Sequence, residues 1–406
     1  MSKNISILGS GIIGLCAGYH LLKKGYKVTF FDKNDPGSGA SYGNAGSFSN
    51  YGAVGLNQPS IINNFSRYLF NTNSSISVQW NYLFKLLPWS FKFLKNCNEK
   101  SMRDTAKKMN DLLILSLSEY EKIFLDIGAE NLIRRNGVIY IYNNSEDPKV
   151  KDSIKVREEL EIKQSILSKS EVHDLEPKLN TIYEGGVFFP TSLHTTNPKK
   201  ISEKIFQKCL ELGASFVKNE VRSVSHNKIQ SSIEEYAFDK LLIAVGSFSK
   251  QFANQIGEKI PLETERGYHI HFKGCEHLIT RPVCSFDTGI YLTPMEQGLR
   301  AAGTVEFGGL LNPLNKKKIH YITKEAKKLI SNLPDPYDSW LGFRPTLPDF
   351  LPVIGESKNY KNIFYAFGHN HLGWTLGAIT GSIISKMISK EGYALNFSQF
   401  SSKRFS

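Results

Sequence analysis

Three glycines near the start of the chain could bind a phosphate-containing ligand. Gly9, Gly11 and Gly14 have the G-x-G-x-x-G spacing of a dinucleotide-binding turn. In such a turn the first glycine allows a sharp change of direction, the second lets the backbone approach a pyrophosphate, and the third lets a helix pack closely on a strand. Asp32 stands about 20 residues further on, where an acid would bind a ribose hydroxyl. Together these residues predict a dinucleotide site.

The segments around the glycines are the elements that such a site needs. An apolar run at residues 5–8 predicts a buried parallel strand before the turn, and a second run at 28–31 ends at Asp32. Between them we expect a helix, which directs its free N–H groups and the positive end of its dipole at the phosphates. The glycine spacing alone is weak evidence, but its place between two apolar strands favours the dinucleotide site over a chance glycine turn.

Later segments complete the predicted fold. Residues 241–245 form an apolar run that is typical of a buried strand. We therefore predict that the parallel sheet is finished far along the chain and that the nucleotide domain is discontinuous. Residues 267–272 alternate as a half-exposed antiparallel strand would, and residues 290–294 and 299–303 flank a hairpin turn. The predicted fold class is α/β, with a Rossmann-like domain and a second domain that contains an antiparallel β-sheet and helices.

Composition and charge narrow the class of protein. The 406 residues are 41% hydrophobic and 22% charged, as in an ordinary soluble globular protein, and no apolar run is long enough to span a membrane. Lysine-rich segments at 316–318 and 324–328 are interpreted as the solvated face of a helix, so the net charge of +12 does not predict nucleic-acid binding. The five cysteines are scattered, which favours reduced thiols, a cytoplasmic location and no metal site.

Residues 78–97 are rich in aromatic side chains and carry three lysines. Two interpretations stay open: core helices on both sides of Pro88, or an amphipathic surface segment that touches a membrane. We favour core packing, because several apolar residues fall off any single helical stripe. The second interpretation would place the protein peripherally on the cytoplasmic face of the inner membrane.

Five motifs, taken in order, resemble those of the FAD-dependent D-amino acid oxidase and dehydrogenase superfamily. They are ILGSGIIGL near the start, SYGNAGSFS at 41–49, AVGSFS at 244–249, LGFRPTLPDFLPVIG at 341–355 and GHNHLGWTLG at 368–377. The last two are the most specific, and within the superfamily the chain most resembles the small subunits of bacterial D-amino acid dehydrogenases. The resemblance implies oxidative deamination of an amino acid with FAD. It also implies non-covalent FAD, because the region in which some relatives attach the flavin has no cysteine.

The resemblance also assigns cofactor-binding residues. Residues 45–47 would run beside the pyrophosphate and flavin, Val221 would contact the adenine side through its main chain, and residues 373–375 would place a helix N-terminus against the flavin. A helix N-terminus suits this place because the reduced flavin is negatively charged near N1. The predicted cofactor site consists of Gly9, Gly11, Ile12, Ile13, Gly14, Asp32, Lys33, Ser41, Asn44, Ala45, Gly46, Ser47, Val221, Gly246, Gly368, Leu372, Gly373, Trp374 and Thr375.

Three residues are candidates for catalysis. Arg344 aligns with the arginine that binds the substrate carboxylate in this superfamily, and Tyr291 with a tyrosine that contacts the same group. A planar guanidinium can give a carboxylate two parallel hydrogen bonds. His369, with its neighbour His371, flanks the site. The implied reaction is hydride transfer from Cα to flavin N5, followed by hydrolysis of the imino acid to a 2-oxo acid and ammonia, and it needs no strong base.

The predicted organisation leaves several alternatives. The FAD-binding domain comprises residues 1–79, 178–255 and 335–393, the substrate-binding domain residues 80–177 and 256–334, and a tail follows at 394–406. The rival functions are oxidation of glycine, sarcosine or proline-type amines, a flavoprotein subunit of a larger complex, and an NAD(P)-dependent dehydrogenase. The sequence leaves open the amino acid oxidised, the oligomeric state, and whether oxygen, a quinone or another carrier accepts the electrons.

Overall fold

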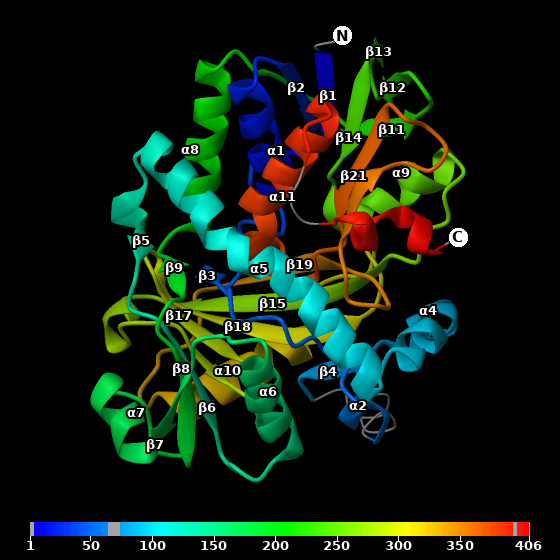
Figure 1. The fold of residues 1–406 in the computed structure, drawn as a ribbon. Coiled ribbons are helices and arrows are strands. Elements are labelled where there is room, and N and C mark those ends of the chain that lie inside the picture. Colours follow the sequence, from blue (N-terminus) through cyan, green and yellow to red (C-terminus); the bar gives the residue numbers. More distant parts are fainter. Residues whose placement is uncertain (1–3, 64–73, 393–395, 406) are drawn as a thin grey trace.

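The computed structural model describes residues 4–63, 74–392 and 396–405, and two large β-sheets organise it (Figure 1). In the upper half of Figure 1 lies a six-stranded sheet with the order β10-β2-β1-β14-β21-β20. Its strands are β1 (Asn4–Leu8), β2 (Lys27–Asp32), β10 (Ser215–Lys218), β14 (Lys240–Ile243), β20 (Val353–Glu356) and β21 (Ile363–Phe367). All neighbouring strands are parallel except β20 and β21.

The pairing of β1 with β14 confirms that this sheet is assembled from distant parts of the chain. Ile5 faces Lys240 and Leu8 faces Ile243 in parallel register. Residues 5–8 are buried, as expected for a parallel strand that is covered on both faces. The predicted Rossmann-like α/β arrangement is therefore present.

Both faces of the six-stranded sheet are covered. Ile7 and Phe30 pack in a core with three helices, whereas Leu8 and Phe31 pack in a second core on the opposite face. The helices of the first face are α1 (Ile12–Lys23), α8 (Pro198–Glu211) and α11 (Gly373–Ser389). The second face is covered by α9 (Ser249–Gln255) and by the sheet of β11 (Val221–Val224), β12 (Lys228–Ser231) and β13 (Glu235–Ala237).

Glycines let α11 pack closely against two other helices. A Cβ at Gly381 would lie 2.5 Å from the carbonyl carbon of Cys16 in α1. A Cβ at Gly377 would lie 2.5 Å from the hydroxyl of Tyr120 in the long helix α5 (Glu99–Ile127). α5 runs diagonally between the two sheets in Figure 1. The start of α11 is thereby fixed where the two sheets meet.

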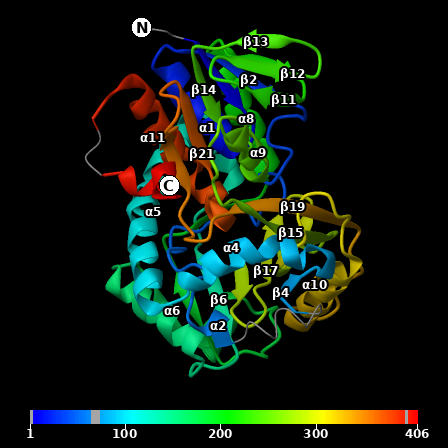
Figure 2. The same cartoon turned by 90° about the vertical axis from the view of Figure 1, so that its right-hand side faces the viewer.

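The second large sheet has nine strands and lies in the lower half of the molecule (Figures 1 and 2). Its main order is β19-β15-β18-β17-β16-β6-β8-β7, and β4 pairs with β18. Its strands are β4 (Ile76–Val78), β6 (Val138–Tyr142), β7 (Ser165–Ser168), β8 (Gly185–Phe189), β15 (Glu263–Phe272), β16 (Val283–Ser285), β17 (Tyr291–Met295), β18 (Gly298–Phe307) and β19 (Asp338–Thr346). The predicted hairpin is confirmed by β17 and β18, in which Met295 faces Gly298.

The prediction of a half-exposed strand at 267–272 is wrong, because every residue of β15 is buried. One face of β15, with Tyr268 and Ile270, packs in a core with α10 (Lys316–Leu329). On the other face His269 contacts the loop at 42–44, since its Nδ1 lies 3.1 Å from the Gly43 carbonyl oxygen. A polar histidine in an alternating pattern therefore marks a covered, hydrogen-bonded face here and not a solvated one.

Shorter elements complete the fold. A small sheet contains β3 (Ser47–Phe48), β9 (Leu193–Thr195) and β5 (Ile133–Arg134), and the remaining α-helices include α2 (Ser60–Asn63), α6 (Pro148–Glu159) and α7 (Lys169–Leu175). The predicted boundaries near 79, 178 and 335 fall beside strands β4, β8 and β19, which all pair in the nine-stranded sheet. The exact division into two domains stays a prediction. Among the described helices, none has the length and apolar character needed to cross a bilayer.

The helix α4 (Leu83–Lys95) lies on the surface and crosses the front of the molecule in Figure 2. It is one helix that continues through Pro88. Leu86 and Trp89 are buried, but Phe84 and Phe91 are 82% and 64% exposed. The favoured interpretation as core helices on both sides of Pro88 is therefore wrong, because the apolar side chains are divided between a buried and an exposed face.

Candidate active site

A cavity of about 920 Å³ lies between the two large sheets. At one end, Gly9 and Asp32 line it, next to the carboxyl ends of β1 and β2. At the other end, Tyr291 and Arg344 of the nine-stranded sheet line it. Ligands of open α/β sheets bind at the carboxyl ends of the parallel strands, and this volume suits a large organic ligand.

The glycine turn forms the first end of the cavity. Gly9 has φ +100°, and a Cβ there would lie 2.5 Å from the Ala244 carbonyl oxygen. A Cβ at Gly14 would lie 2.0 Å from the Gly9 carbonyl oxygen. Gly11 has only ordinary contacts, with Ser41 Oγ at 3.4 Å from a built Cβ. The first and third glycines are thus required by packing, and the second leaves the backbone open to a ligand.

The carboxylate of Asp32 is held in position beside this turn. Its Oδ2 accepts hydrogen bonds from the backbone N–H and the hydroxyl of Ser10, at 2.8 and 2.9 Å. Its Oδ1 accepts one from the backbone N–H of Asn34 at 3.0 Å. Because each carboxylate oxygen can accept more than one hydrogen bond, Asp32 is oriented and still able to bind a ribose hydroxyl.

The loop at 41–47 lines the middle of the cavity, and Arg300 of β18 holds its backbone. The Nη1 of Arg300 donates to the carbonyl oxygens of Tyr42 and Asn44, at 3.0 and 2.6 Å. The Asn44 side chain accepts from the N–H of Gly46 at 2.5 Å, and Gly46 has φ +69°. Ser41 Oγ accepts from the N–H of Ile12 at 2.9 Å, at the start of α1. These bonds fix the loop against the nucleotide end.

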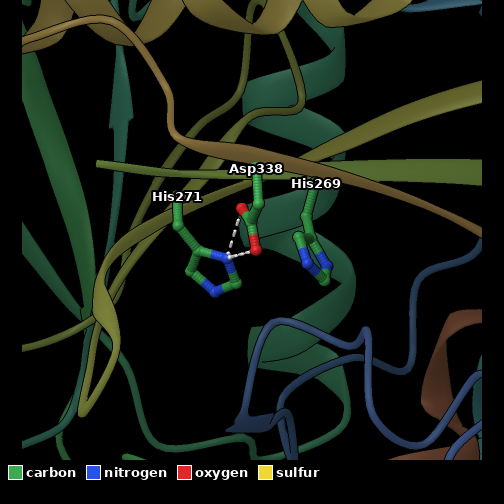
Figure 3. A group of neighbouring side chains, drawn as sticks. All are labelled: His269, His271 and Asp338. Atoms are coloured by element: carbon green, nitrogen blue, oxygen red, sulfur yellow. Dashed lines mark hydrogen bonds and ion pairs between the residues drawn. The ribbon is translucent and has the colours of Figure 1, made fainter. Parts of the chain in front are cut away.

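Three side chains near Arg300 bring potential metal ligands within 4.8 Å of one another: His269, His271 and Asp338 (Figure 3). His271 Nδ1 lies 2.8 and 3.0 Å from the two Asp338 carboxylate oxygens, as the dashed lines in Figure 3 show. His271 Nε2 accepts from Arg300 Nε at 2.9 Å, which places the ring proton on Nδ1, where it is donated to Asp338. Both nitrogens of His271 are thereby engaged, and the group orients Arg300.

The start of α11 borders the cavity with Gly373 and Trp374. The Trp374 carbonyl oxygen accepts from the Tyr120 hydroxyl at 2.5 Å, and Thr375 Oγ1 accepts from the N–H of Ser49 at 2.8 Å. Trp374 Nε1 is buried and has no hydrogen-bond partner among the described residues. This end therefore offers an unused donor and a helix N-terminus to a ligand.

His369 lines the cavity just before α11. Its Nε2 lies 3.0 Å from Thr380 Oγ1, and burial lowers the pKa of the ring to about 3. A group with this pKa is neutral at neutral pH, so His369 has no imidazolium proton to give to a substrate. Its hydrogen bond to the side of α11 supports a positioning role.

Arg344 of β19 faces the cavity with a nearly free guanidinium. Its Nη1 donates to the Thr304 carbonyl oxygen at 2.8 Å. A Cβ at Gly267 would lie 2.4 Å from Nη2, so this glycine makes room for the side chain. Burial lowers the pKa of Arg344 and the negative charge of Glu265 opposes this effect, but the two form no ion pair. Burial also raises the pKa of Glu265, which lines the same cavity.

Tyr291 belongs to a cluster of tyrosine hydroxyls at the far end of the cavity. Its hydroxyl lies 2.5 Å from that of Tyr51 and 2.6 Å from that of Tyr140. Burial raises the pKa of all three, so the hydroxyls keep their protons at neutral pH. Arg157 of α6 is adjacent, with its Cζ 5.9 Å from the Tyr140 ring centroid.

The structure brings most of the predicted site residues together around one cavity. The predicted cofactor residues that line it are Gly9, Gly11, Ile12, Ile13, Asp32, Lys33, Ser41, Asn44, Ala45, Ser47, Val221, Gly246, Gly373 and Trp374. Those behind the lining are Gly14, Gly46, Gly368, Leu372 and Thr375, and Gly14 and Thr375 support it through the contacts given above. The three candidate catalytic residues Arg344, Tyr291 and His369 also line it.

Four functional side chains were not predicted: Arg157, Tyr140, Glu265 and Arg300. Tyr140 lies in β6, and the alternation of a strand alone does not say which face meets a cavity. Arg157 occurs in a polar helix with no motif. None of the four carries a local signal, because only tertiary packing joins their segments.

These features fit FAD. The cavity begins at a glycine turn with a ribose-binding acid, runs along a loop of small residues, and ends beside a second helix N-terminus with an unused indole N–H. The fold and the site together define a flavin-dependent oxidoreductase. The chain belongs to the FAD dependent oxidoreductase family (DAO), whose model matches residues 4–387.

Individual relatives agree with this assignment. The chain is 30% identical to a D-amino-acid oxidase of Bradyrhizobium diazoefficiens, over 99% of each chain, and 26% identical to a D-amino acid dehydrogenase of Helicobacter pylori, over 97% of this chain and 96% of that one. Among solved structures, glycine oxidase from Geobacillus kaustophilus has a TM-score of 0.74 at 18% identity, over 98% of each chain. L-proline dehydrogenase from P. horikoshii has a TM-score of 0.75 at 18% identity, over 100% of this chain and 98% of that one. The last two show that the fold is shared.

Replacing Arg300 by Met should weaken FAD binding about tenfold or more. The substitution leaves the carbonyl oxygens of Tyr42 and Asn44 without their buried donor, so the cofactor loop loses its support. The measurement is the ratio of flavin to protein after gel filtration. Arg281→Met is the matched control, because Arg281 binds Glu176 and does not line the cavity. Equal FAD content in Arg300→Met and wild type would contradict this role.

Proposed function

We propose that the protein oxidises D-amino acids at the Cα–N bond, giving an imino acid that water hydrolyses to a 2-oxo acid and ammonia. The observation that carries the proposal is the guanidinium of Arg344, which lines the cavity without an ion pair in the described part of the chain. A substrate carboxylate would form the ion pair that Arg344 lacks, through two parallel hydrogen bonds. The choice of the D enantiomer is supported by the names of the Bradyrhizobium and Helicobacter relatives.

The chain's own residues orient the substrate. Bound FAD supplies the acceptor for two electrons and the Cα hydrogen. Arg344 binds the carboxylate and Tyr291 flanks it, with its hydroxyl held by Tyr51 and Tyr140, so that the Cα–H bond is turned toward the cofactor. Gly267 and Gly342 line this part of the cavity, where the first makes room for the Arg344 side chain and the second for the Trp340 ring. No side chain is assigned as a base, because the neutral amine of the substrate needs none.

Replacing Arg344 by Met should raise KM for D-alanine about 100-fold and leave the bound FAD in place. The substrate carboxylate then loses its charged partner at a site from which water is largely excluded. Steady-state kinetics and the visible flavin spectrum measure the two effects separately. Arg404→Met is the matched control, since that guanidinium binds Asp349 and does not line the cavity. An unchanged KM in Arg344→Met would refute the assignment, and a greater kcat/KM for glycine or proline than for any D-amino acid would favour those amines as substrates.

We also propose that α4 attaches the protein to an anionic membrane surface, where a quinone serves as the electron acceptor. Phe84, Phe91 and Leu87 are exposed on the helix, which suits insertion among lipid headgroups. Lys85, Lys92 and Lys95 are exposed on the same segment and would attract anionic lipids. The helix is too short to span a membrane, so the contact would be peripheral, at the cytoplasmic face.

The double variant Phe84→Glu/Phe91→Glu should bind anionic vesicles at least about tenfold more weakly than wild type, because two inserted rings are replaced by charges that the lipid repels. Co-sedimentation with anionic phosphatidylglycerol vesicles measures the binding. Comparison with phosphatidylcholine vesicles, which have no net charge, measures how much of the binding is electrostatic. Ile233→Glu is the control, because Ile233 is 81% exposed and distant in sequence from α4. Wild-type protein that stays in the supernatant with both vesicles would argue against membrane attachment.

A further inference from the structure

A second guanidinium lines the far end of the cavity. Arg157 lies on α6. It lines the cavity together with Lys149 and Ser153, which precede it on the helix at intervals of four residues. One face of this helix therefore gives that end of the cavity a positive character. Asp287 also borders it, but its carboxylate accepts the N–H of Asn143 at 3.1 Å and forms no ion pair with Arg157.

Arg157 is buried with most of its hydrogen-bonding capacity unused. It is 4% exposed, yet of its five N–H donors only two have acceptors among the described residues. Nε donates to the Tyr51 carbonyl oxygen at 3.2 Å, and Nη1 to the Ser153 carbonyl oxygen at 3.4 Å. No carboxylate in the described part of the chain pairs with it. A buried cation without a counter-ion is costly, unless an anion arrives with a ligand.

Several arginines that do not line the cavity are held by protein partners. Arg266 binds Glu306 at 3.0 Å and three backbone carbonyl oxygens, and Arg281 binds Glu176 at 2.9 Å. Arg300 is held by His271 and two carbonyl oxygens, and only its Nη2 has no partner among the described residues. In contrast, Arg157 and Arg344 both line the cavity and have no ion pair within the described residues. These two guanidinium groups without an ion pair are therefore located where a ligand can reach them.

The surroundings of Arg157 stabilise its charge and add a further donor. Its Cζ lies 5.1, 5.9 and 6.0 Å from the ring centroids of Phe189, Tyr140 and Phe286. Two hydrogen bonds connect the hydroxyls of Tyr51, Tyr140 and Tyr291. Each bond uses one hydroxyl proton, so one of the three protons is left for another acceptor. Tyr140 lines the cavity and can direct this proton toward an anion beside Arg157.

We propose that Arg157, together with the Tyr140 hydroxyl, binds a second carboxylate, so that the preferred substrates are amino acids with an acidic side chain. The inference rests on the proposed function, in which Arg344 binds the α-carboxylate. A dicarboxylic substrate would then meet one guanidinium at each end. Specificity arises because a neutral side chain leaves Arg157 buried without an anion.

The test compares D-glutamate with D-glutamine and D-aspartate with D-asparagine, which differ in charge and little in shape. In the FAD-loaded wild type, kcat/KM should be at least tenfold greater for each acid than for its amide. Arg157→Met should lower kcat/KM for the acids about 100-fold and for the amides less than about threefold, and Arg157→Lys should restore part of the preference. Arg344→Met should instead lower kcat/KM for all four amino acids by a similar factor. A wild type that prefers the amides, or equal losses for acid and amide in Arg157→Met, would overturn the proposal.

A binding measurement on the wild type keeps the proposal testable if Arg157→Met does not fold. Glutarate and butyrate are not oxidised, and their binding can be followed through the visible spectrum of the bound flavin. Glutarate should bind at least tenfold more tightly than butyrate, and equal affinities would overturn the second carboxylate site. If no D-amino acid, D-alanine included, reduces the flavin, the proposed function fails, whereas the comparison of glutarate with butyrate still decides whether the cavity binds a second carboxylate.

Discussion

A buried guanidinium joins the nine-stranded sheet to the loop that lines the cofactor end, and the shape of the cavity depends on it. Arg300 belongs to the nine-stranded sheet, but its Nη1 binds the backbone of the loop that lines the cofactor end, at Tyr42 and Asn44. His271 accepts a hydrogen bond from that guanidinium and is itself held by Asp338, so the two residues fix its orientation. One side chain thereby determines how the surface that binds the cofactor faces the surface that binds the substrate. The hydrogen bonds are buried, so water cannot replace them at low cost.

The arginines of this protein divide into two groups by their partners. Arg266 and Arg300 are fully buried and are held by protein acceptors, although Nη2 of Arg300 has no partner among the described residues, and both stabilise the frame of the nine-stranded sheet. Arg157 and Arg344 line the cavity and keep unused donors. Because an unpaired buried cation costs stability, the second group is expected where a ligand supplies the anion. The same reasoning connects the α-carboxylate at Arg344 with a side-chain carboxylate at Arg157.

The sequence predicted those parts of the site whose chemistry is local. Gly9 and Gly14 could be identified because tight turns and close helix contacts need glycine, and Arg344 because it lies in a specific motif. The covered face of β15 and the exposed face of α4 were predicted wrongly, since periodicity shows which residues share a face but not what covers it. Arg157 and Tyr140 could not be predicted, because their segments meet only in the folded protein.

The central claim is that the bound flavin is reduced by a D-amino acid held in this cavity. The most direct measurement mixes the purified holoprotein with single amino acids in the absence of oxygen and follows the visible absorption of the flavin. The account predicts that D-amino acids bleach this absorption and that their L enantiomers do not. Protein that retains FAD, but whose absorption no amino acid and no secondary amine bleaches, would contradict it.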